Sequence, residues 1–382
     1  MKHPFTQWIT PAVFLLLIFG FTTANLLTPD RDFSENENRP LAQKPQFSMA
    51  ALFDGDYTAA VETYLTDQFV GRDSFIGIKT ETDYISGKRD ANDIYFAKDG
   101  YLIQKNPPES IDRGRLTRNI DSVASYTNRA VARYGKEHVR VMIVPTAGEI
   151  LSEKLPPFAQ EFHQPDLLSA IQKKIPEGTF VDLQATLRKH KDEYIFYKTD
   201  HHWTTDGAFY GYEAYCESLG ISPKSKSNFK IETVSEQFEG TLYSKARLLS
   251  TKPDQMKAYF PKQELICRLD YNWGERQSDS LYEESWLEKK DKYSYFLGGN
   301  NPVIKITTNH KNGRHLLLLK DSYAHCMTPF LGNEYETIEL IDLRYFNEKL
   351  SDYETKNNYT DVLVLYNAVT FSGDTGVTKI DR

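Results

Sequence analysis

Apolar residues recur in two distinct patterns along this 382-residue chain. Over residues 49–88 they return every three to four positions, as in an amphipathic helical region. Further along, short continuous apolar runs alternate with helical stretches; the runs are residues 139–144, 180–183, 316–319, 337–341 and 362–366. Runs of this kind are typical of parallel strands that are buried on both faces. We therefore expect an α/β fold with a doubly wound parallel sheet.

The segments between these runs predict helices and one hairpin. Helical spacing and capping residues place helices at about 111–135, 167–174, 204–219, from 323 onward and near 346–350. Asp99-Gly100 separates two short apolar runs and predicts the turn of a hairpin over residues 92–103. Residues 221–300 are rich in Lys, Glu and Tyr with only short alternating stretches, so we expect an irregular insertion with some strands.

The first apolar run is long enough to cross a membrane. No charged residue occurs from Trp8 to Leu27, and about 20 apolar residues span a bilayer as a helix. Lys2 before the run and Asp30 after it fit a cytoplasmic N-terminus with the remaining chain outside the cytoplasm. We expect residues 1–28 to be an uncleaved signal anchor in the cell membrane; a cleaved signal peptide is the alternative. Residues 29–48 are polar and contain prolines, which predicts a tether, and residues 49–382 form the remaining domain.

Charge and cysteine spacing limit the possible partners and metal sites. The net charge is −7, the pI is about 5.8 and no basic block occurs, which argues against a nucleic-acid partner. The three cysteines, Cys216, Cys267 and Cys326, have no metal-site spacing. We expect free buried thiols, with one disulfide as the alternative in an oxidising compartment.

Two polar segments carry the candidate chemistry. In Asp200-His201-His202-Trp203 a carboxylate precedes an imidazole by two positions, so it can fix the tautomer of His202 and stabilise its positive charge. Downstream, the leucine run ends in a short polar turn that carries Ser322, the kind of strand exit that exposes a hydroxyl. We therefore predict a triad of Ser322, His202 and Asp200 for acyl-ester chemistry, with His202 as the base. Taken singly, such residues are also ordinary helix caps.

Further candidates follow other strands, because ligands of doubly wound sheets bind at the carboxyl ends of strands. Asn367, together with backbone N–H groups after Ser322, is expected to bind the oxyanion. Arg344 is expected to bind a polar or anionic part of the substrate, and Trp203 and Tyr323 to line the pocket. An arginine in a salt bridge and an asparagine in a turn are the ordinary alternatives.

A metal site is an alternative use of the histidine pair. Asp200, His201 and His202 are all possible ligands, but adjacent histidines rarely face one ion and no further ligand cluster is visible. In an extended segment His201 would point away from His202 and be structural or pocket-lining. We expect no metal and no bound cofactor.

The same segments resemble a known family. Asp200-His201-His202-Trp203 is similar to the motif that names the DHHW family of membrane-anchored proteins, and Lys320-Asp321-Ser322-Tyr323 resembles its serine segment. Residues 33–41, 69–72, 99–102, 144–146, 291–293 and 298–300 also resemble this group, so the resemblance covers nearly the whole chain. The DHHW proteins in turn resemble the SGNH-like alginate O-acetyltransferases, which share an Asp-x-His-Trp signature.

The resemblance implies an SGNH-like domain whose blocks are permuted, because His202 precedes Ser322 by 120 positions (322 − 202) instead of following it. It implies catalytic roles for Ser322, His202 and Asp200, and less directly the roles given above to Asn367 and Arg344. Lys320 departs from the ordinary SGNH serine motif, which has glycine before Asp-Ser, and this leaves the oxyanion geometry open.

The function that this resemblance implies is O-acetylation of a cell-wall or secreted polysaccharide by a membrane-anchored enzyme. A multi-spanning membrane partner would bring acetyl groups across the bilayer. A carbohydrate acetylesterase is the second enzyme hypothesis, since transfer and hydrolysis differ only in whether a sugar hydroxyl or water attacks the acyl-enzyme. A catalytically silent protein that binds polysaccharide or assists its assembly is the hypothesis from another class.

Overall fold

The structure is a computed structural model that describes residues 6–36 and 39–382, and this part of the chain forms two compact units. Unit 1 contains the described residues up to Lys88 together with residues 244–250. Unit 2 contains residues 89–243 and 251–382. Lys2, which supports the predicted orientation in the membrane, and Glu37 and Asn38 of the segment 33–41 lie outside the described residues.

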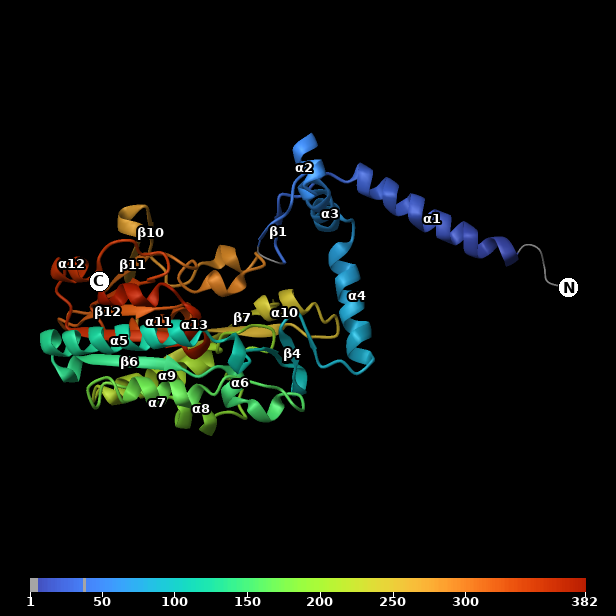
Figure 1. Ribbon diagram of the computed structural model, residues 1–382. Coiled ribbons are helices and arrows are strands. Elements are labelled where there is room, and N and C mark those ends of the chain that lie inside the picture. The colour runs from blue at the N-terminus through green and yellow to red at the C-terminus, as the bar shows by residue number, and fades with distance from the viewer. Residues whose placement is uncertain (1–5, 37–38) are drawn as a thin grey trace. The chain divides into compact units, whose positions relative to one another are not determined.

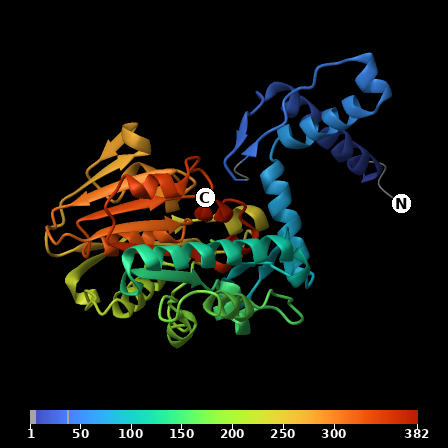
Figure 2. The same ribbon diagram turned by 60° about the vertical axis from the view of Figure 1, so that its left-hand side comes forward.

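Unit 2 is built on a seven-stranded sheet with the strand order β10-β9-β11-β13-β12-β14-β6. The strands are β6 (Val139–Val144), β9 (Cys267–Tyr271), β10 (Arg276–Ser278), β11 (Val303–Thr308), β12 (His315–Lys320), β13 (Thr337–Ile341) and β14 (Asp361–Asn367). Figure 2 shows this sheet from β6, in teal, to the orange strands at its other end.

The sheet is mixed, which confirms the α/β class but not a wholly parallel sheet. β13, β12, β14 and β6 pair in parallel, whereas β11, β9 and β10 pair antiparallel. β9 and β10 are joined by the short turn Asn272–Gly274. A parallel pair needs a crossover of about a dozen residues or more, so a connection of this length forces antiparallel pairing.

Both faces of the sheet are buried, as the continuous apolar runs predict. On β14, Val362 and Val364 face one side and Leu363 and Leu365 the other. The first side is covered by α5 (Arg113–Tyr134), α12 (Leu350–Thr355) and α13 (Ala368–Gly373), and α7 (Gln164–Gln172) contributes to the same core. The second, opposite side is covered by α9 (Thr205–Ser218) and α11 (Ala324–Leu331) (Figure 1).

Several local signals are confirmed. Thr204 caps α9, since its hydroxyl accepts the N–H of Gly207 at 3.2 Å. Asp99 and Gly100, with φ values of +60° and +77°, form the turn between β4 (Ile94–Phe96) and β5 (Leu102–Gln104). The other short elements of this unit are β3 (Asp90–Ala91), α6 (Ala147–Ile150) and α8 (Gln184–Lys189).

Two predicted elements are wrong. The run at 180–183 forms only an isolated bridge between Phe180 and Val141. The helix predicted near 346–350 begins only at Leu350, as α12. Phe346 and Leu350 are both buried in the core, so their helical spacing reflects the packing of a loop instead of a continuous helix.

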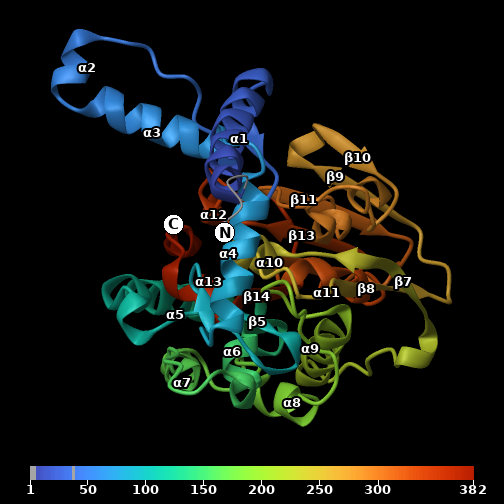
Figure 3. The same cartoon turned by 90° about the vertical axis from the view of Figure 1, so that its right-hand side faces the viewer.

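Residues 221–300 supply a long hairpin besides β9 and β10. β7 (Phe229–Phe238) pairs antiparallel with β8 (Asp254–Pro261). Phe229 and Tyr259 from this hairpin belong to the same hydrophobic core as α9. Figure 3 shows the two strands near this helix.

The three cysteines are free and buried, as predicted, with Cys216 on α9 and Cys326 on α11. Burial raises the pKa of the Cys326 thiol to about 12, so this group is neutral near pH 7.

Unit 1 contains α1 (Thr6–Leu27), β1 (Phe33–Ser34), β2 (Arg39–Pro40), α2 (Met49–Phe53), α3 (Asp56–Gln68) and α4 (Arg72–Ile85). The stretch Trp8–Leu27 is long and apolar enough to cross a membrane and is not buried inside the protein; a signal sequence has the same properties. The segment predicted to be a tether makes specific contacts, because Arg39 forms a 2.6 Å ion pair with Asp67 on α3.

Candidate active site

The Asp-His-His-Trp segment forms a polar turn between Phe196 and Trp203, which pair as an isolated antiparallel bridge. The backbone N–H of Tyr197 donates to the carbonyl of His202 at 3.2 Å and closes the turn. Asp200 Oδ1 accepts the backbone N–H of His202 at 3.0 Å. The same turn therefore holds both the carboxylate and the imidazole.

Ser322 lies in the turn between β12 and α11. Asp321 anchors this turn: its Oδ1 accepts the N–H of Tyr323 at 2.9 Å, and its Oδ2 accepts the backbone N–H of Asn367 at 2.8 Å. Asp321 and Tyr323 are fully buried, whereas Ser322 between them stays partly exposed. The strand exit therefore presents the serine hydroxyl, as its sequence predicts.

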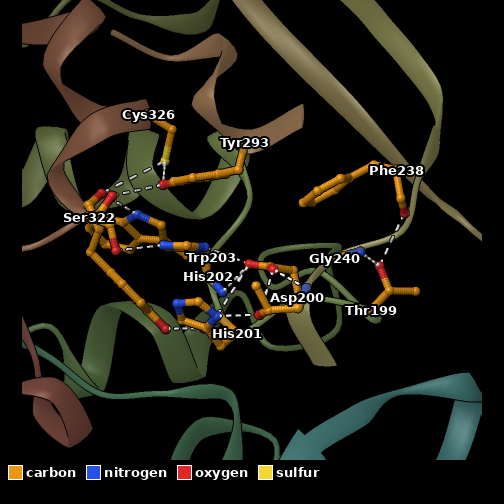
Figure 4. A network of polar contacts seen from close by, with 12 residues as sticks. Thr199, Asp200, His201, His202, Trp203, Phe238, Gly240, Tyr293, Ser322 and Cys326 are labelled. Carbon is orange, nitrogen blue, oxygen red and sulfur yellow. Dashed lines mark hydrogen bonds and ion pairs between the residues drawn. The ribbon is translucent and has the colours of Figure 1, made fainter. Parts of the chain in front are cut away.

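These two turns bring three side chains into line (Figure 4). Ser322 Oγ lies 2.8 Å from His202 Nε2, and His202 Nδ1 lies 2.5 Å from Asp200 Oδ1. His202 is 5% exposed and Asp200 is 3% exposed, so the pair interacts away from bulk water. A hydroxyl, a base and an orienting carboxylate in this order suit nucleophilic catalysis.

Asp200 is held in its ionised form. Burial raises its pKa, but the charges of the neighbouring histidines and hydrogen bonds from His202 and Thr241 outweigh burial and place the pKa well below the usual value. Thr241, at the start of α10 (Thr241–Ala246), donates its N–H and its hydroxyl to Asp200 Oδ2 at 2.8 and 3.0 Å. An ionised Asp200 can stabilise an imidazolium at His202.

Gly240 allows this close approach. A Cβ atom at this position would lie 2.7 Å from Asp200 Cγ, which is far inside van der Waals contact. The N–H of Gly240 donates to Thr199 Oγ1 at 3.0 Å, so the glycine backbone is fixed beside the carboxylate. Neither Gly240 nor Thr241 stands out in the sequence, since both lie in the segment with the weakest pattern.

Tyr293 is a further residue of the site that the residue pattern did not assign. Its ring stacks on His202, and its hydroxyl donates to the carbonyl of Ser322 at 3.2 Å and contacts Cys326 Sγ at the same distance. The only sequence signal for this residue is the resemblance of residues 291–293 to the DHHW group.

Trp203 and Tyr323 lie in the core instead of lining a pocket. Both are fully buried, the indole N–H of Trp203 donates to the carbonyl of Tyr323 at 2.9 Å, and the hydroxyl of Tyr323 donates to the carbonyl of His201. These bonds join the Asp-His-His-Trp turn to the serine turn. Aromatic residues beside a polar motif look alike in sequence whether they face solvent or the core.

Asn367, at the carboxyl end of β14, serves as a structural cap. Its amide nitrogen donates to Asp321 Oδ2 at 2.7 Å and to Thr370 Oγ1 at 2.6 Å. Its carbonyl oxygen accepts the N–H groups of Val369 and Thr370 at the start of α13. Both amide hydrogens are engaged, so this conformation offers none to an oxyanion.

Arg344, which follows β13, is similarly committed. Its Nε and Nη2 donate to the two carboxylate oxygens of Asp342 at 2.8 and 2.6 Å, and Nη2 also reaches Asn300 at 3.3 Å. A quarter of its side chain stays exposed. The structure thus gives it the salt-bridge role that was the ordinary alternative, with some surface left to meet a ligand.

Lys320, which departs from the ordinary serine motif, is buried in the same ion-pair group. Its ammonium lies 3.1 Å from Asp342 Oδ2 and 2.8 Å from His325 Nε2. Burial lowers the pKa of Lys320 while Asp342 opposes that shift, and burial together with Lys320 lowers the pKa of His325. A neutral His325 can therefore accept a hydrogen bond from the Lys320 ammonium.

The metal alternative is compatible with distances but not with the hydrogen bonds. The ligand atoms of Asp200, His201 and His202 lie within 4.8 Å of one another, and the two imidazole rings are 3.9 Å apart because the segment bends instead of extending. His201 therefore lies beside His202, not opposite it. His202 already uses both ring nitrogens, and His201 Nδ1 lies 2.8 Å from Thr241 Oγ1, so an ion would have to displace these contacts.

Comparison with known proteins places this geometry in a family. A DHHW family protein from Eubacterium siraeum matches with a TM-score of 0.63 and 29% identity, over 76% of this chain and 95% of that chain. PatB1 of Bacillus cereus, solved with a sulfonyl adduct, matches with a TM-score of 0.62 and 20% identity, over 76% of this chain and 100% of that chain, and so shares the fold. No curated protein matches the sequence. The sequence profile of the DHHW proteins matches residues 37–96 and 117–341, which is most of the chain. The protein therefore belongs to the DHHW family.

Proposed function

We propose that this protein is a serine-dependent O-acetyltransferase that modifies a cell-wall or secreted polysaccharide. The hydrogen-bonded series Ser322 Oγ, His202 and ionised Asp200 carries this proposal. The partial exposure of Ser322 favours an enzyme over a silent binding protein, because its hydroxyl can meet a substrate. The histidine turn precedes the strand exit that carries Ser322 along the chain, and this order supports an SGNH-like domain with permuted blocks.

In the first step Ser322 Oγ attacks the carbonyl carbon of an acetyl donor while His202 Nε2 takes the hydroxyl proton. Asp200 stabilises the imidazolium through Nδ1. The bond to the leaving group then breaks, Nε2 returns the proton to that group, and the acetyl group stays on Ser322.

In the second step a sugar hydroxyl attacks the acetyl carbon and gives its proton to His202. The bond from that carbon to Ser322 Oγ breaks, and Oγ regains the proton. The backbone N–H of Ser322, next to the N-terminus of α11, is our proposed donor to the oxyanion in both steps, because Asn367 is engaged elsewhere.

Anchoring of the enzyme by α1 completes the proposal. Helix α1 would hold the catalytic unit outside the cytoplasm, where such a polymer lies, and a multi-spanning membrane protein would supply the acetyl groups. The length and exposure of Trp8–Leu27 support this arrangement.

The test is release of a chromogenic acetyl ester by the full chain, beside Ser322→Ala and His202→Ala. We expect each variant to lose activity by about a thousandfold or more. Ser351→Ala, an exposed serine at α12, is the control and should keep the parent rate. A sulfonyl fluoride should label Ser322 in the parent chain, and acetyl transfer to added glycan should exceed release to water. Equal activity of Ser322→Ala, or an unreactive parent, would contradict the proposal.

A further inference from the structure

Unit 1 carries an exposed apolar groove near the end of α1. The apolar groove is lined mainly by Leu52, Val61, Leu65, Phe69, Phe75 and Ile76. Leu65 is 58% exposed and Phe75 is 46% exposed. Contiguous apolar surface of this kind marks an interaction site.

The apolar groove is fastened to the last turns of α1. Phe21 packs against Phe69 and Phe75 with ring centroids 5.7 and 5.5 Å apart. The side-chain carbonyl of Asn25 accepts the N–H of Val70 at 2.8 Å. These contacts hold the turn between α3 and α4 (residues 69–71), which we call the elbow, against the end of α1. Figure 1 shows these three helices of unit 1.

The position of Phe21 sets the depth of that elbow in a membrane. The 20 residues Trp8–Leu27 cover a hydrocarbon core about 30 Å thick with no surplus length. Phe21 precedes Leu27 by six positions, which is about 9 Å at ~1.5 Å per residue. When α1 spans a bilayer, Phe21 therefore lies inside the extracytoplasmic leaflet, and its partners Phe69 and Phe75 lie at a similar depth.

We propose that the apolar groove is immersed in the extracytoplasmic leaflet and binds lipid acyl chains, so that the elbow is a second membrane contact beside α1. This inference rests on the anchoring part of the proposed function and is independent of catalysis. Charge favours acyl chains over anionic headgroups, because residues 28–88 contain 11 acidic and 6 basic residues. The apolar side chains must then supply the affinity.

The experiment uses the full chain in phosphatidylcholine nanodiscs, with and without lipids that carry a nitroxide on the acyl chain. An environment-sensitive fluorophore is attached to Leu65→Cys in the apolar groove, to Thr63→Cys on the same helix, or to Ile18→Cys within α1. Thr63 is exposed and does not line the groove. The native cysteines are buried, so labelling is confined to the introduced thiol.

We expect nitroxide quenching to be strong at positions 18 and 65 and several-fold weaker at 63. Equal quenching at 65 and 63 beside strong quenching at 18 would overturn the proposal and show that the apolar groove faces water or protein. Absence of quenching at 18 would overturn it together with the anchor. Hydrolysis of the chromogenic ester, measured on the same samples, reports the catalytic proposal separately.

Discussion

Tyr293 lies face to face with His202, with ring centroids 3.7 Å apart and planes inclined by 11°. The Tyr293 hydroxyl also donates to the carbonyl of Ser322 at 3.2 Å. One side chain thus contacts both the proposed base and the backbone of the proposed nucleophile. This double contact fixes the plane of the imidazole, and with it the direction in which Nε2 meets Ser322 Oγ.

Replacement of Tyr293 should separate these two contacts. Tyr293→Phe keeps the stacked ring and loses only the hydroxyl, so kcat/KM for a chromogenic acetyl ester should fall by no more than about tenfold. Tyr293→Leu also removes the ring and should cost about a hundredfold, because small displacements of a catalytic group are expensive. Thermal unfolding of both variants is the control. Equal rates in the two variants would show that stacking does not position His202.

Gly240 should be as necessary as the carboxylate that it accommodates. In Gly240→Ala the new methyl group would collide with Asp200 and move it away from His202 Nδ1. We expect kcat to fall by about a hundredfold or more, towards the loss of about 10⁴ typical of an Asp→Asn change in a triad. Gly373→Ala is the matched control, since a Cβ there meets nothing within 4 Å. An unchanged kcat in Gly240→Ala would show that Asp200 does not need its present position.

The parts of this fold that could be predicted are those with local signals. The leucine run of β12 and the polar break after it identify a buried strand and an exposed Ser322 without knowledge of any partner. The spacing of Asp200 and His202 likewise predicts their contact, because two positions in a turn suffice to bring them together. Each of these features depends on a few neighbouring residues.

The remaining features depend on contacts between distant segments. Tyr293 meets His202 across 91 positions (293 − 202), from a segment in which neither helical nor strand spacing persists. The strand end at Asn367 is predictable, but the sequence does not show that Asp321 and Thr370 use its amide hydrogens. The antiparallel pairing of β9 with β10 depends on their short connection, which lies in that same segment.

Asp321 should make stability depend on pH. Burial raises its pKa to about 6, above the value of about 3.9 in an unfolded chain. The folded protein then holds this proton more tightly, so the stability that Asp321 contributes is fully present below about pH 4. It is lost as pH rises through about 6, by up to about 3 kcal/mol. In Asp321→Asn, Tm should lack this fall between pH 4 and pH 7, although the variant is less stable throughout. A parallel pH profile in both proteins would contradict the assignment.

Asp342 should be the most sensitive member of the buried ion-pair group. Asp342→Asn leaves the buried ammonium of Lys320 without its carboxylate, which costs about 3–5 kcal/mol in comparable pairs. Lys320→Met removes the charge itself and leaves Asp342 paired with Arg344, so it should cost less. Denaturant unfolding of the two variants compares them directly. A larger loss in Lys320→Met would mean that the lysine contributes more than charge compensation.

A substitution at His201 distinguishes the triad from the metal alternative. A metal bound by Asp200, His201 and His202 would need His201 as a ligand, whereas in the triad this side chain lies beside Thr241 and the face of His202 and takes no part in the proton transfer. His201→Asn places an amide close to the position of Nδ1, so the Thr241 contact can persist. We expect this variant to keep ester hydrolysis near the parent rate and a chelator to leave both proteins unaffected. Loss of activity in both treatments would instead assign the three residues to a metal, because the triad requires neither His201 nor an ion.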